Sequence, residues 1–104
     1  MPAPAFTPWP GSRPPSEAEL EAALRGEGLT PRWWSNAPGD TYGSHSHPYH
    51  KVLYCLRGSI RFIVGPSGEP FDLSPGDRLD LPPRIAHSAV VGPSGVACAE
   101  APRP

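Results

Sequence analysis

The chain has two histidines separated by a single residue and a third histidine far along the sequence. His45 and His47 lie in the segment GDTYGSHSHPYHKVLYCLRG, and His87 follows forty positions after His47. Alternate residues of a β-strand share a face, so the first two imidazoles are predicted to point in the same direction. Histidine gains little from apolar burial and each ring nitrogen needs a partner, whereas a divalent metal satisfies several rings at once. The spacing therefore predicts a metal site.

The segments that must position these histidines have the pattern of short strands. From Gly39 onwards, proline and glycine fall in clusters between alternating apolar runs, which is typical of turns in an all-β domain. The runs are TPRWWSN, DTYGSHSH, KVLYCLRG, SIRFIVG, PFDLS, DRLDLP, HSAVVG and GVACAEA. We therefore expect seven or eight strands, with successive strands forming antiparallel hairpins, in a barrel or a double-sheet sandwich.

The N-terminal region differs in composition from the rest. Residues 1–15 contain six prolines, so we expect an extended arm that cannot form a hydrogen-bonded strand. Residues 16–104 are predicted to be one domain, because the chain is long enough for a single modest core. Ser16 and Glu19 have the spacing of a capping box, which predicts a short helix over about 16–26.

The segment KVLYCL carries apolar side chains on both of its faces, so it must be covered twice. One face is expected to meet the barrel interior. The other face must be covered by the helix, the proline-rich arm or a second copy of the chain, and we favour the arm and a partner in a homodimer together. Trp33 and Trp34 are adjacent, so one is predicted to fill the barrel and the other to pack outside it.

Two segments of the chain resemble the two sequence motifs of the cupin superfamily. The first motif is glycine, five residues, His-x-His, three or four residues, glutamate, six residues and glycine, and it is matched by Gly39, His45, His47 and Gly58. The second motif is glycine, five residues, proline, one residue, glycine, two residues, histidine, three residues and asparagine. It is matched by Gly76, Pro82 and His87, with Arg84 in place of the second glycine and Val91 in place of the asparagine. The resemblance implies a small single-domain cupin, an all-β, antiparallel double-stranded β-helix (jelly-roll) barrel, here with a short N-terminal helix.

The resemblance also implies a divalent metal inside the barrel, held by the histidines and the glutamate of the first motif and the histidine of the second. His45, His47 and His87 occupy the three histidine positions, but Lys51 occupies the position of the glutamate. A protonated lysine has no lone pair to donate, and its charge disfavours a nearby dication. The four-ligand set of the family is therefore broken.

Three arrangements of the site stay open. In the first, Lys51 turns towards solvent or an acidic neighbour, and the three histidines hold zinc, iron, nickel, manganese or copper with water. In the second, Lys51 enters the pocket, replaces the metal and binds an anionic small molecule. In the third, a bulge at Pro48 turns His50 inward as a fourth ligand. Tyr42 and Tyr49 are further candidate ligand-binding residues.

These arrangements lead to different functions. With a metal, the protein is expected to be a dioxygenase, an isomerase or a lyase that acts on a small organic molecule. Without a metal, it is expected to be a non-catalytic module that binds a small acid or a sugar, with Lys51 as the charge partner. A third hypothesis is an interaction module with an empty barrel.

Charge and cysteine content argue against other partners. The formal net charge is -1, with 9 basic and 10 acidic residues that form no basic cluster, so neither nucleic acid nor a membrane surface is expected to bind. No apolar run approaches the length of a membrane span. Cys55 and Cys98 have no metal-binding spacing, and the start of the chain does not resemble a signal peptide. We therefore expect a cytoplasmic protein with two free, buried thiols.

Overall fold

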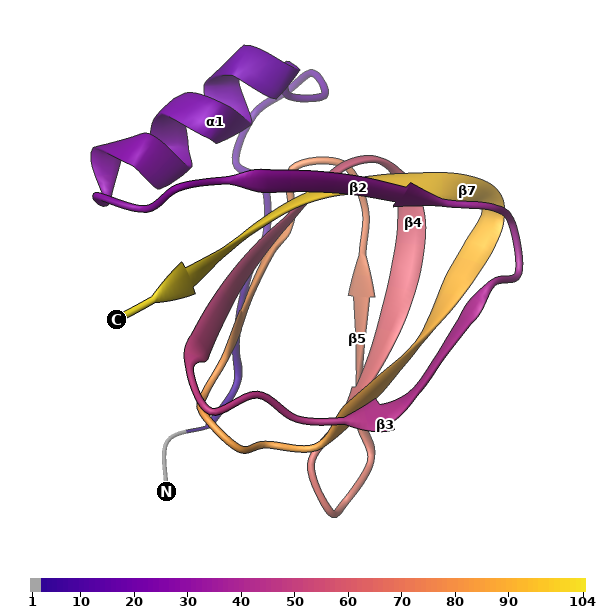
Figure 1. Cartoon of the computed structure of the whole chain (residues 1–104). Coiled ribbons are helices and arrows are strands. Elements are labelled where there is room, and N and C mark those ends of the chain that lie inside the picture. The colour runs from indigo at the N-terminus through magenta and orange to yellow at the C-terminus, as the bar shows by residue number, and fades with distance from the viewer. Residues whose placement is uncertain (1–2) are drawn as a thin grey trace.

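The computed structural model describes residues 3–104 as a curled antiparallel sheet with one helix on its outside (Figure 1). In chain order the elements are β1 (Ala5–Thr7), α1 (Glu17–Gly26), β2 (Arg32–Asn36), β3 (Thr41–His45), β4 (His50–Val64), β5 (Glu69–Leu73), β6 (Arg78–Leu81) and β7 (His87–Arg103). The sequence-based expectation of an all-β antiparallel fold with a short N-terminal helix is confirmed.

Two long strands organise the sheet. The strand order is β1-β6-β4-β7-β2, with β3 also paired to β7 and β5 also paired to β4. β4 and β7 pair with each other along most of their length. On its other side, β4 pairs first with β6 and then with β5, and β7 pairs first with β3 and then with β2. The prediction that successive strands form hairpins holds for β4 and β5 but is wrong for the other neighbours in sequence. β2 and β3 both pair with β7, and β6 pairs with β4 and β1, so none of these strands pairs with its neighbour in the sequence.

Pairs of predicted short strands merge into these two elements. KVLYCLRG and SIRFIVG form β4, while HSAVVG and GVACAEA belong to β7. β4 turns at Gly58, which has a φ of 77° and lies so close to β7 that a Cβ there would be 2.0 Å from the carbonyl oxygen of Gly95. A strand that bends through glycine looks like two strands in the sequence, because the apolar alternation is interrupted at the bend.

The N-terminal arm forms a strand, which corrects the sequence-based expectation. Ala5, Phe6 and Thr7 pair with Asp80, Leu79 and Arg78 of β6. The three residues between Pro4 and Pro8 keep their backbone N–H groups, and an edge strand needs hydrogen bonds on one side only. The arm continues over the barrel through Trp9, whose backbone N–H donates to Asp77 Oδ1 at 3.0 Å.

The core lies inside the curled sheet, and the helix covers the outside of β4. The interior cluster includes Leu53 and Cys55, whereas Val52 and Leu56 pack outside against residues of α1 and its flanking loop. Of the alternatives for this outer face, the structure places the helix there through Leu20 and Leu24, so the preference for the arm is wrong. Trp34 packs against the inner cluster and Trp33 against the outer clusters, as predicted.

The helix begins where the capping box predicts. Ser16 Oγ accepts a hydrogen bond from the backbone N–H of Glu19 at 3.1 Å, and Glu19 Oε1 accepts one from the backbone N–H of Ser16 at 2.9 Å. Both partners satisfy N–H groups that the first helical turn leaves free. The helix then leads directly into the loop before β2.

The two cysteines oppose each other on β4 and β7 and are free and buried, as predicted. A hydrogen bond with Cys55 and burial raise the pKa of the Cys98 thiol, which keeps it protonated and a poor metal ligand. Among residues 3–104, no helix is long and apolar enough to cross a membrane.

Candidate metal centre

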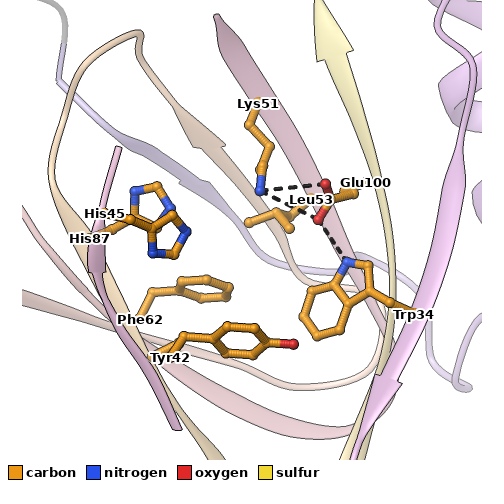
Figure 2. Close-up of a pocket in the computed structure, with 9 residues that line it drawn as sticks. Trp34, Tyr42, His45, Lys51, Leu53, Phe62, His87 and Glu100 are labelled. Carbon is orange, nitrogen blue, oxygen red and sulfur yellow. Dashed lines mark hydrogen bonds and ion pairs between the residues drawn. The ribbon is translucent and has the colours of Figure 1, made fainter. Parts of the chain in front are cut away.

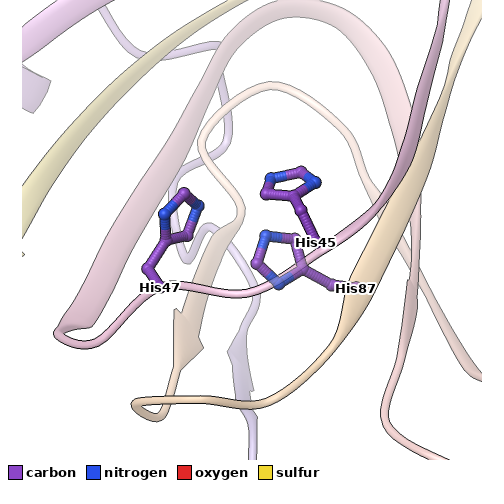
Figure 3. Close-up of side chains that lie close together, drawn as sticks. All are labelled: His45, His47 and His87. Carbon is purple, nitrogen blue, oxygen red and sulfur yellow. The ribbon is translucent and has the colours of Figure 1, made fainter.

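The three histidines come together at one end of the sheet from three different segments (Figure 3). His45 ends β3 and is paired in register with His87, which begins β7. His47 lies beyond the end of β3, so the prediction that it shares a strand face with His45 is wrong. The backbone N–H of Arg84 donates to the carbonyl oxygen of His47 at 2.7 Å and holds this loop against the turn before β7. Arg84 has a φ of 63°, a conformation that explains the glycine of the second motif.

The imidazoles are close enough to share one ligand. Their ring centroids are 4.4 Å apart for His45 and His87, 5.0 Å for His45 and His47, and 5.4 Å for His47 and His87. One ring nitrogen from each residue lies within 4.8 Å of the others. Burial increases from His45, which is exposed, through His47 to the buried His87. The group therefore lies at the boundary between the interior of the sheet and solvent.

Backbone carbonyls fix which nitrogen of two of these rings is free. His45 donates from Nδ1 to the carbonyl oxygen of Gly43 at 2.8 Å, and His87 donates from Nδ1 to that of Ile85 at 3.1 Å. A carbonyl oxygen only accepts, so in the neutral rings the lone pair is at Nε2. His47 Nε2 is buried and has no hydrogen-bond partner among the described residues. Two oriented Nε2 lone pairs and one buried, unpartnered Nε2 fit a metal ion held by three imidazoles.

The surroundings favour neutral imidazoles, which is the form that binds metal. Burial lowers the pKa of His87 to about 4, and the charges of neighbouring His45 and Lys51 act in the same direction. Burial also lowers the pKa of His47, again with help from the positive charge of Lys51. Near neutral pH both rings are therefore unprotonated.

This protonation state makes the stability of the metal-free protein depend on pH. The pKa of His87 is about 4 in the folded chain against 6.5 for the unperturbed group, so between these values the unfolded state binds more protons. The free energy of unfolding is expected to fall by up to about 3 kcal/mol as the pH falls from 7 to 4. Urea unfolding with a chelator present measures this, and His87→Gln should reduce the pH dependence. An unchanged dependence in the variant would contradict the assignment.

A cavity of about 170 Å³ adjoins the histidines inside the curled sheet. His45 and His87 lie on one side of it, and Lys51 and Glu100 lie on the other (Figure 2). Apolar side chains, among them Leu53 and Phe62, line the space between them. The site therefore combines imidazole nitrogens that could hold a metal ion, an ion pair and an apolar wall.

The residue at the glutamate position of the first motif faces this cavity. Lys51 is 9% exposed, and its Nζ lies 3.4 Å from both carboxylate oxygens of Glu100. Trp34 donates from Nε1 to Glu100 Oε1 at 2.7 Å. Glu100 was not among the residues expected at the site, although it lies two residues after the interior Cys98 on the same strand and therefore on the same face. Lys51 thus both enters the pocket and meets an acidic neighbour.

The other predicted site residues are placed differently. His50 does not join the three histidines, because its Nε2 lies 2.9 Å from Asp80 Oδ1 in a separate cluster of charges. The bulge considered for the Pro48 segment therefore does not turn His50 inward. Tyr49 stacks on His47 with ring centroids 5.1 Å apart, and Tyr42 lines the cavity while its hydroxyl contacts Asn36.

Comparisons with known proteins agree with this architecture. A family model described as "Cupin domain" matches residues 32–95, a range that contains all three histidines and more than half of the chain. No curated protein sequence matches the chain.

Solved structures share the fold. An RmlC-like cupin from Shewanella frigidimarina is 26% identical with a TM-score of 0.63, over 71% of this chain and 64% of that protein. KdgF from Halomonas sp. is 26% identical with a TM-score of 0.60, over 73% of this chain and 70% of that protein. The DMSP lyase DddQ from Ruegeria pomeroyi is 22% identical with a TM-score of 0.66, over 73% of this chain and 38% of that protein, a likeness of fold alone. This chain therefore spans less than two thirds of the first and third of these proteins.

Proposed function

This chain belongs to the cupin domain family, and we propose that His45, His47 and His87 bind one divalent metal ion beside a cavity for a small organic ligand. One observation carries the proposal: three imidazoles converge, two with Nε2 freed by backbone hydrogen bonds and one with a buried, unpartnered Nε2. Zinc, iron, nickel, manganese and copper all accept imidazole ligands.

The metal would supply Lewis-acid or redox chemistry, which suits a dioxygenase, an isomerase or a lyase. The chain's own residues have the other tasks. The backbone carbonyls of Gly43 and Ile85 orient two of the imidazoles. The apolar wall formed by Leu53 and Phe62 excludes water from the body of the ligand, and Tyr42 and Tyr49 border the site.

Metal content is the direct test of this function. The protein should be purified without chelators and without a nickel-binding tag, and its metal measured by elemental analysis. We expect about one divalent ion per chain, bound again after chelation and dialysis against zinc. Protein that contains no metal and takes up none would contradict the proposal.

That contrary result would favour a second candidate function. Lys51 lies in the cavity where the family motif has glutamate, so it could supply the positive charge without a metal. In this case the protein would be a non-catalytic module for a small anionic compound or a sugar, with Lys51 as the charge partner. The homodimer and the cytoplasmic location stay predictions from the sequence.

The charge at position 51 gives a second test of the metal site. The double variant Lys51→Glu with Glu100→Gln should bind divalent metal more tightly, by roughly 10- to 30-fold. Burial is the main cause of the lowered pKa values of His47 and His87. The double variant removes the positive charge of Lys51, which contributes to both shifts, and adds a carboxylate at the motif position. Competition with a chelator measures the affinity, with Glu100→Gln alone as the control. Equal affinity in the double variant and the control would show that position 51 does not face the metal.

A further inference from the structure

The wall of the cavity opposite the histidines holds a buried ion pair, and neither of its two residues is a proposed metal ligand. The Lys51 side chain is 11% exposed and the Glu100 side chain 20% exposed, so both charges are largely removed from water. A lysine ammonium has three N–H donors, and among residues 3–104 Glu100 is its acceptor. At least one donor is therefore left for a molecule that occupies the cavity.

Glu100 is itself held in place. Its Oε1 accepts the 2.7 Å hydrogen bond from Trp34 Nε1, and Trp34 packs edge-on against Tyr42 with ring centroids 5.9 Å apart. This support keeps the carboxylate beside Lys51, so the ammonium stays at the cavity wall rather than extending to solvent. Trp34 and Glu100 therefore act as positioning residues for Lys51.

The balance of charge indicates what the cavity accepts. Lys51 and Glu100 cancel each other, so a divalent ion at the three histidines would leave the site with two uncompensated positive charges. A ligand that carries a carboxylate reduces this excess. A sugar would leave many hydroxyl groups without partners against Leu53, Phe62 and Ala89, at a cost for each unpaired group.

We propose, on the basis of the metal function proposed above, that the ligand is a small organic acid with an apolar body, whose carboxylate is received by Lys51 while Glu100 and Trp34 position the lysine. The cavity of about 170 Å³ limits the ligand to a small molecule. Glu100 also competes with the ligand carboxylate for the same ammonium, which makes its effect on affinity opposite to that of Lys51.

Benzoate and benzamide test the proposal, because they have nearly the same shape and differ in charge. Calorimetry on zinc-loaded protein is expected to give at least about tenfold tighter binding of benzoate. Lys51→Met should abolish this preference. Glu100→Gln keeps an acceptor oxygen that can still position Lys51 but removes the charge that competes with the ligand, so it should increase benzoate affinity several-fold. Opposite shifts at the two members of one ion pair cannot come from a general loss of packing. Equal binding of the two probes, or a preference that survives in Lys51→Met, would overturn the inference.

Zinc uptake is measured first for each protein, which separates this inference from the metal proposal. Wild-type protein that takes up no zinc would overturn the metal function. The same two probes on metal-free protein would then decide the inference alone: a preference for benzoate that Lys51→Met removes supports it, and no preference overturns it. Circular dichroism of each variant confirms that the fold is retained.

Discussion

His45→Ala is expected to weaken divalent metal binding at least about 100-fold. Structural zinc sites with four protein ligands bind the ion with about 10–16 kcal/mol, so the loss of one ligand is expected to cost about 3–4 kcal/mol. His45 is the exposed member of the group, so its replacement leaves no cavity in the core. The affinity is measured by competition with a chelator of known strength, and circular dichroism reports the fold.

His50→Ala is the matched control for this variant. His50 lies five residues further along the chain, but its imidazole is paired with Asp80 rather than with the other histidines. Its replacement should change the metal affinity by less than about threefold, because the ligand set is untouched. Equal losses in both variants would mean that stability rather than coordination is being measured. Unchanged affinity in His45→Ala would remove this residue from the metal site.

Arg78→Met is expected to lower the free energy of unfolding by about 3 kcal/mol. Arg78 contacts Asp80 through Nε at 2.7 Å and through a terminal nitrogen at 3.1 Å, and it also binds Glu27 and the hydroxyl of Tyr54. The side chains of Arg78 and Asp80 are 15% and 16% exposed. Removal of the arginine would leave the carboxylate of Asp80, which is largely shielded from water, without its main partner, and this is costly. Methionine keeps most of the apolar volume, so the loss reports mainly on charge.

The pKa of Asp80 supports this expectation. Burial by itself would raise it, but the hydrogen bonds from Arg78 and His50 outweigh burial, and the pKa is lowered. A lowered carboxyl pKa contributes stability above its unfolded value of about 3.8 and loses it as the pH falls through the folded value. The destabilisation by Arg78→Met should therefore be present at pH 7 and shrink as the solution is acidified below pH 4.

A second arginine–aspartate pair provides the comparison. Arg61 binds Asp72 with two hydrogen bonds of 2.7 and 3.0 Å, but the two side chains are 56% and 65% exposed. Arg61→Met is expected to lower the free energy of unfolding far less than Arg78→Met, because water replaces the lost partner. Urea unfolding at pH 7 measures both variants. Similar losses for the two arginines would contradict the view that burial gives the Arg78 cluster its importance.

Local signals predicted the helix and the strands well. Ser16 and Glu19 mark the start of α1, because a capping box satisfies its hydrogen bonds within four residues of chain. The neighbours Trp33 and Trp34 were correctly placed on opposite faces, since alternation needs no knowledge of the partner strand. The merging of two apolar runs at Gly58 escaped prediction, because the bend is required by the close approach of Gly95, more than thirty residues later.

The amino-acid sequence by itself determined the chemical character of the site: three imidazoles, a lysine where the family motif has glutamate, and the barrel that carries them. These properties depend on residue type and on short spacings, both of which can be read directly from the sequence. Only the tertiary structure decided the partners. It joined Lys51 to Glu100 and His50 to Asp80, and it placed the helix rather than the arm over the outer face of β4. Such pairings follow from strand register and packing between distant segments, which no local pattern encodes.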